Sequence, residues 1–199
     1  FRASASTDGG PPKTVAFKRL LPHVVADPKL VEMFLDEAKL AILLTHPHIV
    51  EAYESGRHGG SYFLSMEWID GVNLRRVLQR CVEVERRIPL GVICYIGAAI
   101  ADALSYMHQI RDEDGRPLGV IHRDISPPNI LLTHAGLPKL IDFGLCKSEM
   151  NQSVTDPGIV KGKYGYLCPQ AASGEVVDQR TDIFALGVCL WEMVARRRL

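Results

Sequence analysis

Three oxygen-bearing side chains flank two short expected strands in the second half of the chain. Asp124 and Asn129 precede the strand expected at 130–133. Asp142 directly follows the partner strand expected at 139–141. A hairpin of these strands returns Asp142 to the neighbourhood of Asn129, where two oxygen ligands suit a hard divalent cation such as Mg²⁺. Asp124 leads into the same corner, where a carboxylate can accept a proton from an attacking hydroxyl.

Lys18 and Glu37 form a second candidate pair in the first quarter of the chain. Lys18 ends the strand expected at 14–18, where a lysine is usually solvated at an edge. Glu37 lies in the helix expected at 28–44 and interrupts its apolar stripe. The stripe consists of Met33, Leu40 and Leu44. A carboxylate on such a face requires a partner because an unpaired buried charge is costly. Glu32 is the competing acidic residue, but its surroundings indicate a solvent-facing position.

The elements that position these residues fall into two regions. Short strands surround one helix as far as about Trp68, and the chain then becomes helical. The expected elements are strands at 14–18, 49–55 and 61–69 with a turn at 56–60, and helices at 28–44, 73–84 and 90–108. A polar loop at 145–165 is long enough to be uncommon unless functional. The sequence therefore predicts a strand-rich unit over residues 1–69 and a helical unit over residues 70–199.

Composition limits the classes of function. With 199 residues, of which 47% are hydrophobic, the chain can bury a core as one domain or two small lobes. The zero net charge argues against binding to nucleic acid or an anionic membrane, and five cysteines without a CxxC pair favour a reducing compartment. The longest apolar stretch, 90–101, is shorter than the roughly 20 residues that a bilayer requires. We expect a cytoplasmic domain without nucleic-acid or membrane contacts, any anchor lying outside this segment.

Four motifs in order resemble the protein kinases. The segment 122–129, HRDISPPN, followed by DFG at 142–144 is similar to the catalytic and metal-binding loops of that family. The segment 15–18, VAFK, resembles its Val-Ala-Ile-Lys strand, and DIFALG at 182–187 resembles the start of its central helix. The four motifs most resemble those of bacterial, eukaryotic-like Ser/Thr protein kinases. The resemblance implies an α+β, two-lobed fold with a strand-rich small lobe and a helical large lobe. We expect truncation at both ends, without the Gly-rich loop and the last large-lobe helices.

The resemblance also implies a reaction, the transfer of the γ-phosphoryl group of ATP to a Ser or Thr hydroxyl of a protein substrate in signalling. Asp124 would orient or deprotonate the acceptor hydroxyl, and Asn129 and Asp142 would hold Mg²⁺ or Mn²⁺. Lys18, paired with Glu37, would hold the α- and β-phosphates. The adenine ring would lie where the lobes join, between apolar side chains and against backbone groups. The residues implied there are Ala16, Met66, Glu67, Trp68 and Leu131.

Three departures from the family pattern bear on activity. Ser126 stands where Ser/Thr kinases usually carry a lysine that neutralises the transferred phosphoryl group. Lys163 stands where the family usually has a Thr that faces the catalytic Asp. We hypothesise that Lys163 supplies the missing catalytic charge, and a surface lysine in a polar loop is the alternative. Gln170 replaces the usual Glu of the Ala-Pro-Glu motif, and it can hydrogen-bond but cannot form an ion pair.

Two other function classes remain open. A pseudokinase, which binds nucleotide or acts as a scaffold, is favoured by Ser126 and Gln170 and disfavoured by the retained lysine, carboxylates and Asn129. A small-molecule kinase of similar fold is the second alternative, although the long loop that ends at Pro169 favours a protein substrate. Arg123 resembles the arginine of kinases whose loop is ordered by phosphorylation. The candidate acceptors are Ser148, Ser153 and Thr155.

Overall fold

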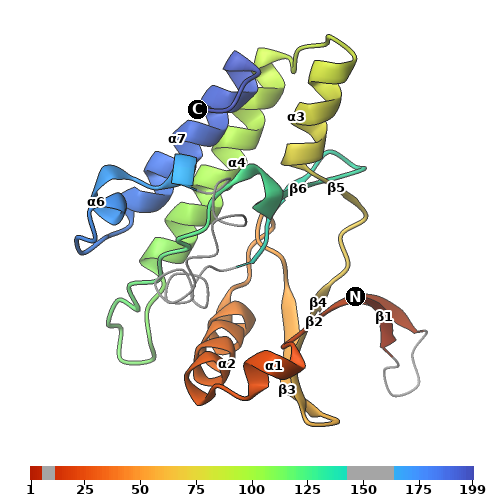
Figure 1. Ribbon diagram of the computed structural model, residues 1–199, viewed down its shortest axis with the longest axis vertical. Helices are drawn as coiled ribbons and strands as arrows, with labels where there is room; N and C mark the ends of the chain where they lie inside the picture. Colours follow the sequence, from red (N-terminus) through yellow and green to blue (C-terminus); the bar gives the residue numbers. More distant parts are fainter. Residues whose placement is uncertain (6–11, 143–163) are drawn as a thin grey trace.

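The computed structural model describes residues 1–5, 12–142 and 164–199. Its elements form two groups at opposite ends of the molecule (Figure 1). One group contains a four-stranded sheet with helices α1 and α2, and the other contains a three-stranded sheet with the longer helices. The α+β fold with a strand-rich lobe and a helical lobe, expected from the sequence, is confirmed.

The four-stranded sheet is antiparallel, in the order β1-β2-β4-β3. Its strands are β1 (Arg2–Ala5), β2 (Lys13–Arg19), β3 (Ala52–His58) and β4 (Ser61–Glu67). The turn expected at 56–60 is shorter, because His58 pairs with Ser61 and only Gly59 and Gly60 lie between them. Both glycines have positive φ angles, 55° and 77°. Positive φ at both central residues is typical of a two-residue type I′ hairpin turn, so the five-residue turn was wrong.

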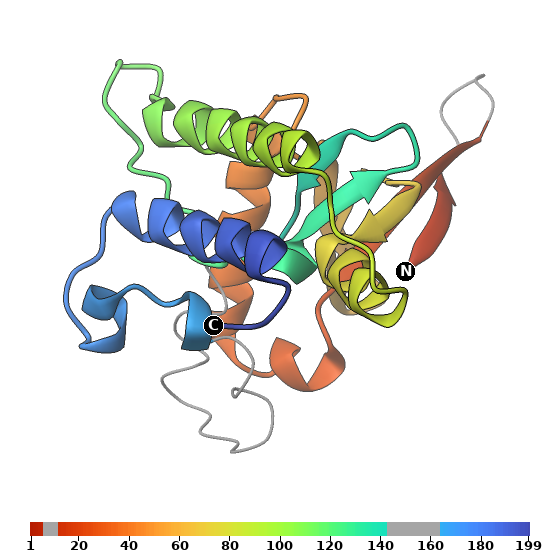
Figure 2. The ribbon, with the colours of Figure 1, turned by 90° about the horizontal axis from the view of Figure 1, so that it is seen from above.

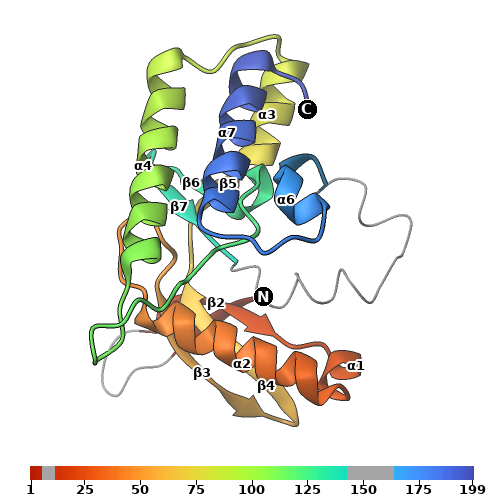
Figure 3. The ribbon, with the colours of Figure 1, turned by 90° about the vertical axis from the view of Figure 1, so that its left-hand side faces the viewer.

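Helix α2 (Pro28–Leu43) follows the short helix α1 (Pro22–Val25) and lies along one face of this sheet (Figure 3). It begins at Pro28, as the sequence predicts. The Asp27 side chain accepts a hydrogen bond from the Lys29 amide at 3.0 Å, and proline fits the first helical turn. The helix buries Phe34, Glu37, Ala38 and Ala41. Its apolar face therefore carries one carboxylate into the interior.

The second group begins with a three-stranded antiparallel sheet of β5 (Gly71–Asn73), β6 (Ile130–Thr133) and β7 (Pro138–Leu140). Its helices are α3 (Leu74–Glu83), α4 (Leu90–Gln109), α6 (Pro169–Ala172) and α7 (Arg180–Ala195), with 3-10 turns η1 (Pro127–Asn129) and η2 (Tyr164–Tyr166). The sequence predicted α3, α4, α7 and the β6–β7 hairpin. It missed β5, α1 and α6, which have only three or four residues each and so show no hydrophobic period. The equally short β6 and β7 were predicted because the connection expected between them contains glycine and proline.

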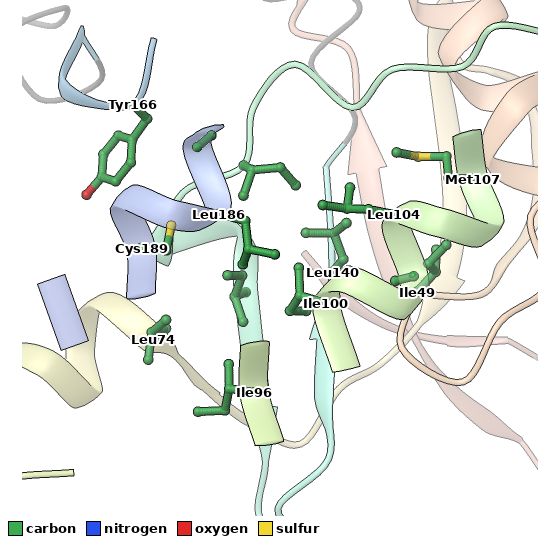
Figure 4. Close-up of a cluster of buried hydrophobic side chains, with 14 of the residues drawn as sticks. Ile49, Leu74, Ile96, Ile100, Leu104, Met107, Leu140, Tyr166, Leu186 and Cys189 are labelled. Carbon is green, nitrogen blue, oxygen red and sulfur yellow. The ribbon is translucent and has the colours of Figure 1, made fainter. Parts of the chain in front are cut away.

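The core of the helical group lies between α4 and α7, which run side by side (Figure 2). Gly97 on α4 allows this approach, because a Cβ atom there would lie 2.8 Å from Leu190 of α7. The core continues past β7 to the loop before β3 (Figure 4). Buried side chains along this path include Ile96, Ile100, Leu104, Met107, Leu186, Cys189, Leu140 and Ile49. One continuous core therefore connects the helices to the strand that precedes Asp142.

Helix α4 is longer than its apolar sequence stretch. It runs from Leu90 to Gln109, past Asp102, and is the one described helix long and apolar enough to cross a membrane by length and composition. The expectation that this segment is too short is therefore corrected. Ile93, Ile96, Ile100 and Met107 lie in the core. Since core helices pass the same test, we retain the interpretation of α4 as a buried helix.

Candidate functional site

The β6–β7 hairpin brings Asn129 next to Asp142. Ile130 pairs with Leu140, and the Ile141 amide donates to the Asn129 carbonyl at 3.0 Å. Asn129 is buried at the end of η1, while Asp142 is half-buried and has a φ of 56°. The backbone hydrogen bond between Ile141 and Asn129 thus holds Asn129 and Asp142 close to each other.

Asp124 lies in a loop that is hydrogen-bonded both to Asn129 and, through His122, to Ile141. The Asn129 Nδ2 atom donates to the Asp124 carbonyl at 2.7 Å, and the Asp124 amide donates to His122 Nδ1 at 3.3 Å. The His122 ring also lies 3.3 Å from the Ile141 carbonyl. These bonds place Asp124, Asn129 and the residue before Asp142 in one hydrogen-bonded unit.

Asp182 anchors the same loop from α7, a role the sequence did not reveal. Its carboxylate accepts hydrogen bonds from the amides of His122 and Arg123, each at 2.9 Å, and lies 2.8 Å from His108 Nε2. Asp182 is fully buried, and Arg123 has a left-handed φ of 63°. Such a backbone costs roughly 1–3 kcal/mol and persists only where neighbouring contacts fix it. Helix α7 therefore fixes the conformation of the loop at His122 and Arg123 through the Asp182 carboxylate.

Lys18 connects α2 to the corner where Asn129 and Asp142 meet. Its Nζ atom is 2.5 Å from Glu37 Oε1 and 3.2 Å from Asp142 Oδ1. Burial lowers the pKa of Lys18, but the nearby carboxylates of Asp142 and Glu37 outweigh it, so the pKa lies above its usual value. The ammonium is thus charged at neutral pH. Glu37 is 3% exposed, whereas the competing Glu32 is exposed. Lys18 is therefore not the solvated edge lysine that a lone strand residue suggests.

The donor atoms at this corner fit Mg²⁺. Asn129 uses its Nδ2 to hold the loop, which leaves its amide oxygen for a ligand, and Asp142 supplies a carboxylate. The described residues contain no group of three or more His, Cys, Asp or Glu side chains that could hold a metal. Mg²⁺ often binds through one or two carboxylates together with substrate phosphates and water. The chain therefore offers a partial set of hard oxygen ligands.

The residues expected around adenine come from both sheets. Ala16 on β2 lies opposite Met66 on β4. Trp68, just after β4, is 39% exposed, and the Arg2 guanidinium lies 5.4 Å from its ring centroid. Leu131 lies on β6, in the other sheet, and is half-buried. The Glu67 side chain is 2.6 Å from Lys139 Nζ, and the Glu67 amide donates to the Glu51 carbonyl at 2.8 Å.

The residues that depart from the family pattern are only partly described. Ser126 is 2% exposed, and its hydroxyl donates to the Asp124 carbonyl at 3.5 Å, which directs it to the loop backbone. Gln170 is exposed on α6. Several expected residues lie outside the described ones: Phe143, Gly144, Ser148, Ser153, Thr155 and Lys163.

A buried polar cluster, also missed by the sequence analysis, holds the segment that follows residue 163. Arg75 on α3 donates to the Tyr166 hydroxyl and lies 3.1 Å from Glu192 Oε2 on α7. The Tyr166 hydroxyl donates to Glu192 Oε1 at 2.9 Å. Burial and then the hydrogen bond to Glu192 raise the pKa of Tyr166 well above its usual value, so the phenol stays protonated. A glutamate inside an apolar helix was the signal that could have identified the cluster.

Comparisons with known proteins agree with this geometry. A family model described as the protein kinase domain matches residues 7–199. The chain is 43% identical over 186 residues to the tyrosine-protein kinase MasK of Myxococcus xanthus. This alignment covers 94% of this chain and 29% of MasK. It is 34% identical over 188 residues to the serine/threonine-protein kinase PknB of Mycolicibacterium smegmatis, covering 92% of this chain and 28% of PknB. The chain thus spans less than a third of the length of either of these relatives.

Solved structures give the same result. The kinase domain of PknI from Mycobacterium tuberculosis superposes with a TM-score of 0.72 at 28% sequence identity. The alignment covers 99% of this chain and 68% of that kinase domain. Almost every described element therefore has a counterpart in a two-lobed kinase domain.

Proposed function

The chain belongs to the protein kinase family, and from this premise we propose that the complete protein transfers the γ-phosphoryl group of ATP to a Ser or Thr hydroxyl of a protein substrate. The contact of Lys18 with both Glu37 and Asp142 carries the proposal, because a charged ammonium lies between the buried Glu37 carboxylate and the Asp142 carboxylate that we assign to Mg²⁺. The retention of Lys18, Glu37, Asp124, Asn129 and Asp142 in one chain argues against a pseudokinase. We also keep the division into lobes at 1–69 and 70–199, and a cytoplasmic location, as part of this proposal.

Each side chain has one task in the proposed reaction. Asp124 accepts the proton of the acceptor hydroxyl, and the loop bonds from Asn129 and Asp182 fix its position. Lys18 binds the α- and β-phosphates, and Glu37 orients it. Asn129 and Asp142 hold Mg²⁺, which neutralises charge on the phosphates when bound. The rate then depends mainly on positioning and on charge neutralisation.

The remaining proposed contacts define the nucleotide pocket. The backbone at Met66, Glu67 and Trp68 hydrogen-bonds adenine, while Ala16 and Leu131 contact the two faces of its ring. Their positions on β2, the end of β4 and β6 are compatible with one pocket between the two sheets. ATP and a protein are the partners, and neither nucleic acid nor a membrane is required.

The class of acceptor residue is tested by phosphoamino-acid analysis. The complete protein is incubated with γ-labelled ATP, Mg²⁺ and a mixture of unstructured proteins, and the labelled product is hydrolysed. We expect phosphoserine and phosphothreonine, as the relationship to PknB suggests. The relationship to MasK, named a tyrosine-protein kinase, favours the other outcome. Phosphotyrosine alone would overturn the proposed acceptor while leaving kinase activity intact.

Lys163 provides a test of how the chain compensates for Ser126. A lysine side chain is long and flexible enough to deliver an ammonium from a different backbone position. One preorganised charge is worth about 10²-fold or more in rate, so Lys163→Ala should lower turnover by that factor with little change in ATP affinity. Ser126→Lys in that background should restore part of the rate. Single-turnover phosphotransfer is the measurement.

The matched control for this experiment is Lys161→Ala, which removes a lysine two positions earlier. It should leave the rate unchanged. If the Lys163→Ala enzyme stays within about twofold of the parent, about 0.4 kcal/mol, Lys163 is a surface lysine with no catalytic charge.

Phosphorylation of the polar loop at 145–165 is a separate prediction. An added phosphate can pair with an arginine such as Arg123, which is exposed in the described structure. Replacing Ser148, Ser153 and Thr155 together by Ala should therefore lower activity by about tenfold, a value in line with a few charge-assisted bonds. Phosphatase treatment of the parent should lower its activity to the same level. Full activity of the triple variant would reject this mechanism.

A further inference from the structure

A second ion pair joins the four-stranded sheet to the segment that carries Asp142. Lys139 lies on β7, and its Nζ atom is 2.6 Å from Glu67 Oε2 at the end of β4. The same ammonium lies 3.5 Å from the carbonyl oxygen of Ile49. The Glu51 amide donates to the same Glu67 oxygen at 3.4 Å. The side chains of Lys139 and Glu67 are only 11% and 28% exposed, so the pair is mostly shielded from water.

Backbone hydrogen bonds hold the surroundings of this pair together. The Leu140 amide donates to the His48 carbonyl at 2.8 Å, and the Val50 amide donates to the Leu140 carbonyl at 2.9 Å. The Glu67 amide donates to the Glu51 carbonyl at 2.8 Å. β7 lies between the four-stranded sheet and the helices (Figure 3). Lys139 therefore sits where β7, the end of β4 and the loop before β3 meet.

The two lysine–carboxylate contacts are spaced alike along their strands. Val15 pairs with Glu67 across β2 and β4, so Lys18 lies three residues from this register position. Lys139 and Asp142 are likewise three residues apart on the other side. The Lys18–Asp142 contact at 3.2 Å and the Lys139–Glu67 contact at 2.6 Å thus both join the four-stranded sheet to the segment 139–142, the first from β2 and the second from β4.

The two contacts differ in what nucleotide binding does to them. In the proposed function, Lys18 would bind the phosphates and Asp142 would bind Mg²⁺, so they would exchange part of their mutual contact at 3.2 Å for these new partners. Lys139 has no part in that exchange. The proposed adenine contact of Glu67 uses its backbone, which leaves the carboxylate paired. The shielded pair can therefore persist while the Lys18–Asp142 pair opens.

We propose that Lys139 is a positioning residue of the nucleotide site, which holds the end of β4 in place relative to Asp142 through Glu67 and the Ile49 carbonyl. This inference rests on the proposed function. Without the ion pair between Lys139 and Glu67, the conformation in which the end of β4 is aligned with Asp142 makes up a smaller fraction of the protein molecules. Nucleotide affinity falls by that fraction, whereas the aligned complex keeps all its reacting groups. Binding should change and the chemical step should not.

The test is Lys139→Met, which keeps the length of the side chain and removes its charge. We expect the KM for ATP, and the Kd of a fluorescent ATP analogue, to rise about tenfold, with kcat within about threefold of the parent. Lys139→Arg retains the cation and should bring both constants back to within about threefold. In a double-mutant cycle, Glu67→Gln should add little to Lys139→Met, because both changes remove one interaction.

The matched control is Lys39→Met, which removes an exposed lysine from a surface ion pair with Asp36 and should change neither constant. Equal losses in kcat and affinity, an unchanged KM, or additive effects in the cycle would overturn the inference. If Lys139→Met does not fold, Lys139→Arg and Glu67→Gln still give the comparison. The analogue titration needs no phosphotransfer, so failure of the proposed kinase activity and failure of this positioning role give different results.

Discussion

Replacing Asp142 by Asn is expected to lower phosphotransfer by about 10³-fold or more while the protein stays folded. The change keeps the size of the side chain but removes the negative charge that faces Lys18 at 3.2 Å and that we propose binds Mg²⁺. Loss of one preorganised charge costs about 10²–10³-fold, and loss of the metal with it costs more. The measurement is the single-turnover rate at saturating ATP and Mg²⁺, with folding checked by circular dichroism and thermal unfolding.

A matched control for this variant is Asp36→Asn on α2. Asp36 pairs with Lys39 at 2.9 Å on the exposed face of the helix, where an ion pair contributes little. The control should transfer phosphate at the parental rate. Parental activity in the Asp142→Asn protein would remove Asp142 from the metal site and the proposed mechanism with it.

Asp124→Asn is expected to lower kcat by about 10³-fold with little change in the KM for ATP. The amide cannot accept the proton of the acceptor hydroxyl, and general-base catalysis contributes about 10²–10⁴-fold. The loop should keep its shape, because Asn129 binds the Asp124 backbone carbonyl and Asp182 binds the loop amides. The measurement is a full kinetic analysis with both ATP and protein substrate varied.

Asp114→Asn is the matched control for that loss, since Asp114 is exposed and lies 3.3 Å from Arg116 in a surface ion pair. Its kinetic constants should equal those of the parent. A loss in the Asp124→Asn enzyme that resides in the KM for ATP would assign Asp124 to nucleotide binding. A loss of less than about tenfold would show that the hydroxyl is deprotonated by another group or by water.

Local sequence signals predicted the elements that position the site. The hairpin that returns Asp142 to Asn129 followed from two short strands, and in the structure Ile130 of β6 pairs with Leu140 of β7. The helix at 28–44 followed from a leading proline and an apolar period. The same period identified Glu37 as a carboxylate on a buried face, and the structure contains its ion pair with Lys18.

The contacts that the sequence could not reveal join residues far apart in the chain. Asp182 binds the amide of His122, 60 positions earlier, and Lys139 pairs with Glu67, 72 positions earlier. Glu192 interrupts the apolar helix α7, as Glu37 interrupts α2, whereas Asp182 lies in the first turn of α7, where an acidic residue is common. The sequence could not say which partners these residues have, because the partners depend on how α7 packs against the catalytic loop and α3.

The most direct test of the kinase assignment is single-turnover transfer from γ-labelled ATP by the complete protein, with Mg²⁺ present and then removed by a chelator. We expect label to move to protein hydroxyls, with one ADP formed for each phosphate transferred, and we expect transfer to stop without Mg²⁺. Saturating binding of ATP with no transfer to any protein, and the same result for the Asp124→Asn and Asp142→Asn variants, would contradict the kinase assignment and identify a pseudokinase.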